Sequence, residues 1–313
     1  MATLVVGLGY VGATLAGRLL GRGERVIGLD NFFSVDRRTT SLLERHGAFE
    51  LIEGDIRSES DVVRAFSVEA VDHLYFCAAQ ASADDSTIPA SYTETTNLIG
   101  PRIVFEEAAR RDVGRIVLAS AMRVYGQPLP SRVDESTPFT FQRDLTHLSK
   151  LYLEGLAHII AERSKMPVVS VRLGVVYGVG AVVKTDPRFM TVANRLCWQA
   201  CHGEAPRLAL GVGHLPIVHV SDAVAGMIRA AQIDEPGYSA VNLAGDPVTL
   251  RDLAEVVASE ASRRGRTFDV PAVGGWKGDA PVVESRLTAM GFAPRVALRD
   301  GLRELIDYFL ARV

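Results

Sequence analysis

Three glycines near the amino terminus have the spacing that a backbone needs to bind a pyrophosphate. Gly7, Gly9 and Gly12 follow the apolar run 3–6, and leucines recur at helical spacing within residues 12–20. The first glycine permits a tight turn, the second lets backbone approach the ligand, and the third lets helix pack on strand. Free N–H groups and the dipole at the start of that helix favour an anion. The residues expected to contact a dinucleotide here are Gly7, Gly9, Tyr10, Val11 and Gly12.

An acidic residue ends the second apolar run, where it would meet a ribose of that dinucleotide. Asp30 follows residues 25–29 and lies eighteen positions after Gly12. A carboxylate at this place accepts the ribose hydroxyls of NAD and repels the 2′-phosphate of NADP. We therefore expect NAD as the cofactor, with NADP as the alternative because Arg37 and Arg38 follow closely.

The elements that would position these residues alternate between strands and helices. Buried strands are predicted at 3–6, 25–29, 50–53, 73–76, 115–118 and 167–172, with helices at 97–111 and 149–165 between the later ones. This alternation predicts an α/β fold, a doubly wound parallel sheet of the Rossmann type. We expect residues 1–178 to form the NAD-binding domain, with 216–245 returning to it. A smaller C-terminal substrate-binding domain is expected from 179–215 and 246–313.

Composition and charge bound the class of protein. The chain has 313 residues, 48% of them apolar and 23% charged, and a net charge of −3, so we expect a globular protein without a nucleic-acid partner. No apolar run reaches the roughly 18 residues that span a bilayer, so no membrane partner is expected. Three cysteines, an odd number, favour a reducing cytoplasm.

A metal site is not expected, although one helix carries a pattern that invites it. Cys197 and Cys201 lie one helical turn apart and His202 follows, but no second pair of ligands lies nearby. A core helix is the favoured interpretation.

Short motifs occur along the chain in one order. Leu29-Asp30-Asn31, the turn 54–57 and the segment 76–80 come first. The later motifs are Asn97 with Gly100, Val124-Tyr125-Gly126, Ser149-Lys150-Leu151, residues 172–178 and residues 218–222. In this order they resemble the extended short-chain dehydrogenase/reductases, the NAD-dependent epimerase/dehydratase family, over nearly the whole chain. That family mostly modifies nucleotide sugars. The resemblance implies further cofactor contacts from Asn31, Asp55, Ile56, Cys77, Ala78, Ala79, Gln80, Asn97 and Lys150.

The chain departs from this family where the family moves protons. The family places a tyrosine four residues before the lysine and a Ser or Thr four residues before the tyrosine of its Tyr-Gly pair. Here these positions hold Thr146 and Ala121, and a threonine hydroxyl does not ionise near neutral pH. Lys150 either holds the nicotinamide ribose or carries the proton itself. His147 is a further candidate acid or base, although adjacent helical residues point about 100° apart. The candidate catalytic residues are thus Lys150, Thr146 and His147.

The substrate contacts depart as well. Leu215, Trp276 and Val175 stand where relatives that bind a nucleotide diphosphate carry two arginines and an asparagine, so the bidentate grip on a diphosphate is lost. Arg123 stands where dehydratases of the family often have an acid, and could bind an anionic substrate. We expect Ala121, Arg123 and Trp276 to line the substrate site.

These residues predict an NAD-dependent epimerase/dehydratase-type oxidoreductase that acts on a hydroxyl carbon of a sugar-like or nucleotide-sugar substrate. A redox-silent NAD-binding protein of the same fold, with a sensing or scaffolding role, is the alternative. A third hypothesis keeps the family's usual nucleotide-sugar epimerase. The resemblance also implies a homodimer formed through helices 97–111 and 149–164.

Overall fold

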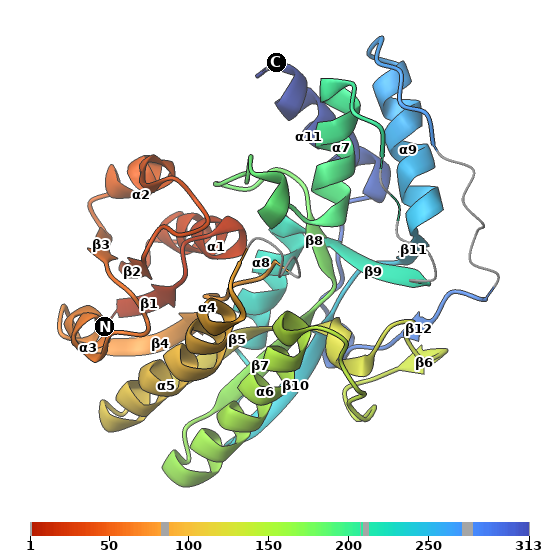
Figure 1. Cartoon of the computed structure of the whole chain (residues 1–313). Coiled ribbons are helices and arrows are strands. Elements are labelled where there is room, and N and C mark those ends of the chain that lie inside the picture. Colours follow the sequence, from red (N-terminus) through yellow and green to blue (C-terminus); the bar gives the residue numbers. More distant parts are fainter. Residues whose placement is uncertain (1, 83–87, 207, 209–212, 271–277, 313) are drawn as a thin grey trace.

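A seven-stranded parallel sheet forms the centre of the molecule (Figure 1). The computed structural model describes residues 2–82, 88–206, 208, 213–270 and 278–312. The strand order is β10-β7-β5-β4-β1-β2-β3, and every neighbouring pair runs parallel. The strands are β1 (Ala2–Val6), β2 (Val26–Asp30), β3 (Phe49–Glu53), β4 (Val71–Phe76), β5 (Arg115–Ala121), β7 (Val168–Leu173) and β10 (Tyr238–Leu243). The predicted doubly wound α/β fold is confirmed.

Helices cover both faces of this sheet, which explains why its strands are apolar throughout. All residues of β1 and β7 are buried. On one face α1 (Tyr10–Leu20) packs beside α8 (Val220–Ala230), and their core includes Leu15 and Val224. The other face is covered by α3 (Glu59–Phe66), α5 (Gly100–Arg110) and α6 (Leu145–Ser164). Smaller pieces are α2 (Ser41–Glu44) and α4 (Ala90–Glu94).

A second layer stands above the carboxyl ends of the large sheet (Figure 1). It contains a three-stranded sheet of β8 (Val175–Tyr177), β9 (His214–His219) and β11 (Pro247–Thr249). The helices α7 (Val192–His202), α9 (Leu250–Ser262) and α11 (Leu298–Leu310) pack into one core with it. β6 (Arg132–Val133) pairs with β12 (Val282–Val283), and α10 (Arg286–Ala289) follows.

The predicted domain boundaries, at residues 178, 215 and 245, stay a prediction. The strands near these boundaries belong to different sheets. β10 joins the large sheet, whereas β8 and β9 pair with each other in the small one. Cys197 and Cys201 are buried free thiols in α7, and no cluster of metal-binding side chains occurs among the described residues. Within the described parts of the chain, no helix is both long enough and apolar enough to cross a bilayer.

Helix α6 begins earlier than the helix predicted at 149–165. Ser149 was expected to open it, but α6 begins at Leu145. The reason is Asp144, whose carboxylate accepts a hydrogen bond from the backbone N–H of His147 and so caps the helix. Thr146 and His147 therefore lie inside the first turn, where the helix fixes their directions.

Candidate functional site

The glycine turn between β1 and α1 has the geometry that its sequence predicts. Gly7 has φ of +90°, and a Cβ added there would lie 2.5 Å from the backbone nitrogen of Ala78. A Cβ on Gly12 would lie 1.8 Å from the carbonyl oxygen of Gly7. A Cβ on Gly9 would meet no described atom within 4 Å. The first and third glycines are thus required by packing, whereas the second borders open space where a ligand can approach.

The start of α1 is suited to a phosphate. Gly9 is the N-cap residue, no described side chain caps the helix, and its first turn carries no acid. The first N–H groups of the helix therefore keep their capacity to bind an anion. Tyr10 is buried, and its hydroxyl donates a hydrogen bond to the carbonyl of Gly178 at 2.6 Å, so its backbone rather than its ring faces a pyrophosphate.

Asp30 lies directly beside the glycine turn. Its carboxylate accepts hydrogen bonds from the backbone N–H groups of Leu8 and Phe32. Burial raises the pKa of Asp30, while these two hydrogen bonds favour its ionised form. Arg37 and Arg38 do not reach it, because Arg37 pairs with Glu44 and Arg38 with Asp36.

The turn after β3 forms the next part of the site. The Asp55 carboxylate accepts hydrogen bonds from Asn31 at 2.7 Å and from the guanidinium of Arg57 at 2.7 Å. Burial alone would raise the pKa of Asp55, but these hydrogen bonds lower it to about 2. Ile56 packs against Gly100, where a Cβ would lie 2.5 Å from it. Asp55 is therefore an ionised acceptor at the edge of the sheet.

Asn97 fixes the segment that follows β4. Its side chain accepts a hydrogen bond from the N–H of Gln80 at 2.8 Å and donates to the carbonyl of Gln80 at 2.9 Å. It also donates to the Ser149 hydroxyl at 3.0 Å. Asn97 lies in a π-helical turn, Thr95–Ile99, of the kind often found at functional sites. Asn97 thus ties the Cys77–Gln80 segment to α6.

Lys150 reaches across to the end of β5. Its Nζ donates a hydrogen bond to the carbonyl of Ala119 at 2.9 Å, and its charge acts on the partly buried thiol of Cys77. Burial lowers the pKa of Lys150 to about 8, and it raises that of Cys77 to about 12. Near neutral pH the lysine is therefore mostly charged, and its neutral fraction grows as the pH approaches 8.

Thr146 and His147 point to different neighbours. The buried hydroxyl of Thr146 donates to the carbonyl of Ser82 at 2.9 Å. His147 Nδ1 lies 2.6 Å from the Asp144 carboxylate, and both side chains are about three-quarters covered. Burial alone would raise the pKa of Asp144, but hydrogen bonds from His147 lower it. His147 and Asp144 form an oriented pair one turn before Lys150.

Arg123 lies after the end of β5, close to that pair. Its Nε is buried and has no hydrogen-bond partner among the described residues. Burial lowers the pKa of Arg123, the charge of Asp144 raises it, and that of Arg143 lowers it. No described carboxylate lies within 4.0 Å of its guanidinium. This is a partly buried cation whose donors are not used up by the protein.

Ala121 leaves the end of β5 without a hydroxyl on the side of the site. Ser120 points away, as strand alternation predicts, and donates to Glu154. Glu154 forms a buried ion pair with Arg172 at 2.8 Å, and Arg172 donates to the Tyr125 hydroxyl at 2.6 Å. This network holds the Tyr125 turn, and it does not replace the missing proton-transfer groups.

The positions expected to have lost a diphosphate contact are apolar. Val175 and Leu215 lie on the paired strands β8 and β9 and pack against the core of the second layer. Trp276 lies outside the described residues.

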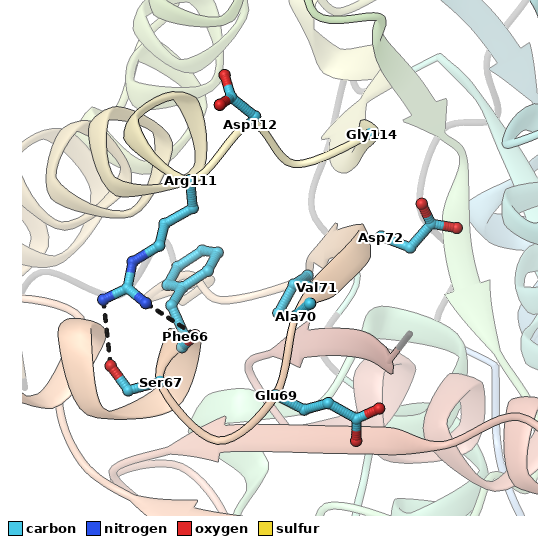
Figure 2. Close-up of a pocket in the computed structure, with 9 residues that line it drawn as sticks. All are labelled: Phe66, Ser67, Glu69, Ala70, Val71, Asp72, Arg111, Asp112 and Gly114. Carbon is cyan, nitrogen blue, oxygen red and sulfur yellow. Dashed lines mark hydrogen bonds between the residues drawn. The ribbon is translucent and has the colours of Figure 1, made fainter.

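A surface pocket near the amino end of β4 is not part of this site. It lies where α3 leads into β4 and where α5 ends, and Arg111 there donates to the carbonyl of Phe66 and to the Ser67 hydroxyl (Figure 2). Ligands of open α/β sheets bind at the carboxyl ends of the strands, and this pocket is at the amino end of β4.

Residues 3–244 match the model of the family described as NAD dependent epimerase/dehydratase. This chain belongs to that family. It is 26% identical to UDP-glucuronic acid decarboxylase 1 of Arabidopsis thaliana, over 98% of this chain and 69% of the relative. UDP-glucuronate 4-epimerase 1 of the same plant is 24% identical, over 99% of this chain and 77% of the relative. The expected family and the expectation of an enzyme are both confirmed.

Solved structures of the family have the same fold. The UDP-glucose 4-epimerase of Thermus thermophilus in complex with NAD is 25% identical, with a TM-score of 0.81 and full coverage of both chains. The UDP-glucuronic acid 4-epimerase of Bacillus cereus, in complex with UDP-glucuronic acid and NAD, is 20% identical with a TM-score of 0.85, again covering both chains fully. The cofactor expected from the glycine turn, NAD, is that of the family.

Three residues close to the candidate site were not singled out from the sequence. Asp144 was readable as a capping acid three residues before His147. Lys184 and Phe189 carried no local signal, since they lie far along the chain from Asp30 and Phe33, beside which the fold places them.

Proposed function

We propose that this chain is an NAD-dependent oxidoreductase that oxidises a hydroxyl-bearing carbon of a sugar-like or nucleotide-sugar substrate, permanently or transiently. The observation that supports the proposal is Lys150, whose ammonium donates a hydrogen bond to the carbonyl of Ala119 and whose pKa burial lowers to about 8. NAD, when bound, supplies the hydride acceptor. The hydroxyl proton passes to the neutral amine of Lys150, and the carbon becomes a carbonyl.

Lys150 is suited to this role because it does not need a tyrosine partner. In the family's usual arrangement the lysine activates the phenol of a tyrosine, but the hydroxyl of Thr146 is a much weaker acid than a phenol. An amine with a pKa near the working pH is itself an effective proton acceptor. The His147–Asp144 pair is the second candidate for the proton, since the carboxylate orients the imidazole and leaves Nε2 for a substrate.

We propose further that the substrate carries an anionic group and that Arg123 binds it. The buried Nε without a partner supports this, because a buried donor that stays unpaired costs free energy that a bound carboxylate recovers. The position lies two residues after Ala121, at the carboxyl end of β5 where substrates of such sheets bind.

The test of the function is a single-turnover measurement with the NAD-loaded chain. UDP-glucose, UDP-glucuronate, glucose and glucuronate are mixed with it in turn, and NADH is followed by absorbance and fluorescence. We expect NADH with at least one compound and its loss in Lys150→Met. Activity retained in Lys150→Met but lost in His147→Gln assigns the proton to the imidazole. No NADH with any compound contradicts the proposal.

The test of Arg123 compares ligands that differ by one carboxylate. UDP-glucuronate and UDP-glucose differ only at C6, as do glucuronate and glucose. We expect Arg123→Met to weaken binding of an acid at least tenfold and to leave its neutral counterpart within twofold. Equal effects on both members, or no preference of the native chain for either acid, reject an anion site.

A redox-silent NAD-binding protein is the second candidate function. The Thr146 hydroxyl donates a hydrogen bond to the carbonyl of Ser82, and Ala121 has no hydroxyl. Neither of the two positions where the family transfers protons therefore carries a group that can do so. This candidate predicts tight NAD binding, no NADH with any hydroxy compound, and no effect of Lys150→Met beyond a change in NAD affinity.

We propose that two copies associate through α6. Leu148, Tyr152 and Ile159 lie along one side of α6 and are 50%, 40% and 47% exposed, and Ile99 before α5 is 43% exposed. An apolar stripe of this kind on a globular protein indicates an interface. Sedimentation should give a dimer that Leu148→Glu with Ile159→Glu dissociates; a native monomer contradicts the proposal. A reducing cytoplasm stays a prediction.

A further inference from the structure

The segment between β8 and α7, residues 178–191, packs along the elements that bind the dinucleotide. Figure 1 shows this green segment extending over α1. The Tyr10 hydroxyl donates to the carbonyl of Gly178 at 2.6 Å, and the N–H of Ala181 donates to the Thr14 hydroxyl at 3.0 Å. The start of the segment is therefore fixed to the helix whose amino terminus receives the pyrophosphate.

Farther along, the segment brings Lys184 opposite Asp30. Each charge acts on the other, and Lys184 is the one cation among the main charges that act on Asp30. Among the described residues the two groups form no ion pair within 4.0 Å, and the Lys184 ammonium lies 5.6 Å from the centre of the Phe189 ring. Burial lowers the pKa of Lys184 to about 8. The Lys184 ammonium and the Asp30 carboxylate thus act on each other without forming a direct ion pair.

The end of the segment adds Phe189 to an aromatic cluster beside Lys184. The Phe189 ring contacts Phe33 edge-on at 5.9 Å, and Phe33 stacks on Tyr92 at 4.1 Å between ring centroids. The guanidinium of Arg57 lies 4.5 Å from the centre of the Tyr92 ring. Together these four side chains line a pocket next to the Asp55 turn. These side chains therefore extend from the segment 178–191 to the turn that follows β3.

A ribose diol has the hydrogen-bonding groups to bind both Asp30 and Lys184. A hydroxyl donates one hydrogen bond and accepts others, so it can donate to a carboxylate on one side and accept from an ammonium on the other. Such a bridge gives the Lys184 ammonium hydrogen-bond acceptors in addition to the Phe189 ring over which it lies. It also places one ligand group between two charges that form no direct ion pair.

We propose that Lys184 is a cofactor-binding residue contributed by the second domain. Its ammonium donates to the ribose oxygens of the adenosine half of NAD, opposite Asp30, and Phe189 covers the same half against Phe33. Binding of NAD therefore joins the two layers of the protein at its adenosine end. This inference rests on NAD being the cofactor and does not depend on the proposed reaction.

The test measures NAD binding to the cofactor-stripped full chain by calorimetry. We expect Lys184→Met to raise the Kd of NAD about tenfold to a hundredfold, which is the effect of losing a hydrogen bond to a charged group. Lys165→Met is the matched control, since Lys165 is 77% exposed at the end of α6, and its Kd should stay within twofold of the native value. Phe189→Ala should raise the Kd severalfold.

A second ligand separates a ribose contact from a general structural role. With NAD that lacks the 2′-hydroxyl of the adenosine ribose, the penalty of Lys184→Met should shrink. The melting temperature of the cofactor-free variant should not fall, because methionine buries more readily than an ammonium. If Lys184→Met does not fold, Lys184→Gln provides the same comparison.

Two results would overturn the inference. One is a Lys184 variant that folds and binds NAD within twofold of the native chain. The other is an equal loss of affinity for NAD and for its 2′-deoxy analogue. Neither result bears on the reaction, which the NADH measurement tests separately.

Discussion

The hydroxyl of Thr146 donates its hydrogen bond to the backbone carbonyl of Ser82, while Lys150, one turn later on α6, donates to the carbonyl of Ala119. The two side chains at the positions of the family's tyrosine–lysine pair, Thr146 and Lys150, therefore do not hydrogen-bond each other. Thr146 anchors the segment after β4 to the helix. Lys150 alone keeps a group that titrates near the working pH.

This division of roles predicts different effects of two substitutions. Thr146→Val should leave the rate of NADH formation within about tenfold of native and cost about 1 kcal/mol of stability, because one hydrogen bond is lost. Lys150→Met should lower the rate by about 10² or more, the usual contribution of an acid or base. Single-turnover kinetics and urea unfolding measure both. A larger loss of rate in Thr146→Val than in Lys150→Met refutes the assignment.

The lowered pKa of Lys150 predicts a pH dependence with a definite sign. Burial lowers the pKa from 10.5 to about 8, so the neutral amine that accepts a proton increases as pH rises through about 8. Oxidation of the hydroxyl should speed up about tenfold per pH unit below that value and level off above it. Stopped-flow measurements from pH 6 to 10 test this, with Lys150→Met showing no such rise. A rate that falls through pH 8 means that the charged form works instead.

Gly9 and Gly12 offer a pair of substitutions that separates binding from folding. Gly9→Ala places its methyl in open space, with φ of −71° that alanine adopts readily, so stability should change by less than about 1 kcal/mol. NAD affinity should fall tenfold or more, because the methyl occupies the approach of the pyrophosphate. Gly12→Ala meets the Gly7 carbonyl and should cost about 2 kcal/mol or more. Native NAD affinity in Gly9→Ala argues against this binding mode.

Asp30 sets the choice between the two nicotinamide dinucleotides. Asp30→Asn should weaken NAD about tenfold, because a charged acceptor of ribose hydroxyls is lost. The preference for NAD over NADP should shrink, since removal of the Asp30 charge also removes the repulsion of the 2′-phosphate. Calorimetry with both dinucleotides checks this. An unchanged ratio of the two Kd values would show that Asp30 does not face the ribose.

The buried pair Glu154–Arg172 should matter chiefly for stability. Glu154→Gln leaves the guanidinium buried without its countercharge, which costs about 3 kcal/mol or more. Urea unfolding of the native chain and the variant gives the difference. The Glu154 charge also acts on Lys150, one turn earlier on α6, so the pKa of Lys150 should fall in the variant, whereas the Kd of NAD at low temperature should stay within twofold.

The sequence by itself determined the sheet and its cofactor edge, because both depend on local patterns. Apolar runs four to six residues long predict buried parallel strands, and three glycines at fixed spacing followed by Asp30 specify a turn whose geometry is set by sterics between near neighbours. The departure at Thr146 was equally readable, since it concerns the identity of one residue at one position.

Only the tertiary structure decided which distant groups share a space. Lys184 and Asp30 are more than 150 positions apart, and no local pattern marks the lysine, so the crossing of the segment after β8 over α1 had to be seen. The same holds for the unused Nε of Arg123, which depends on what surrounds it. The beginning of α6 at Leu145 depends on whether the Asp144 carboxylate reaches the N–H of His147. Charge, burial and unmet hydrogen bonds are properties of surroundings, and surroundings arise when the chain packs.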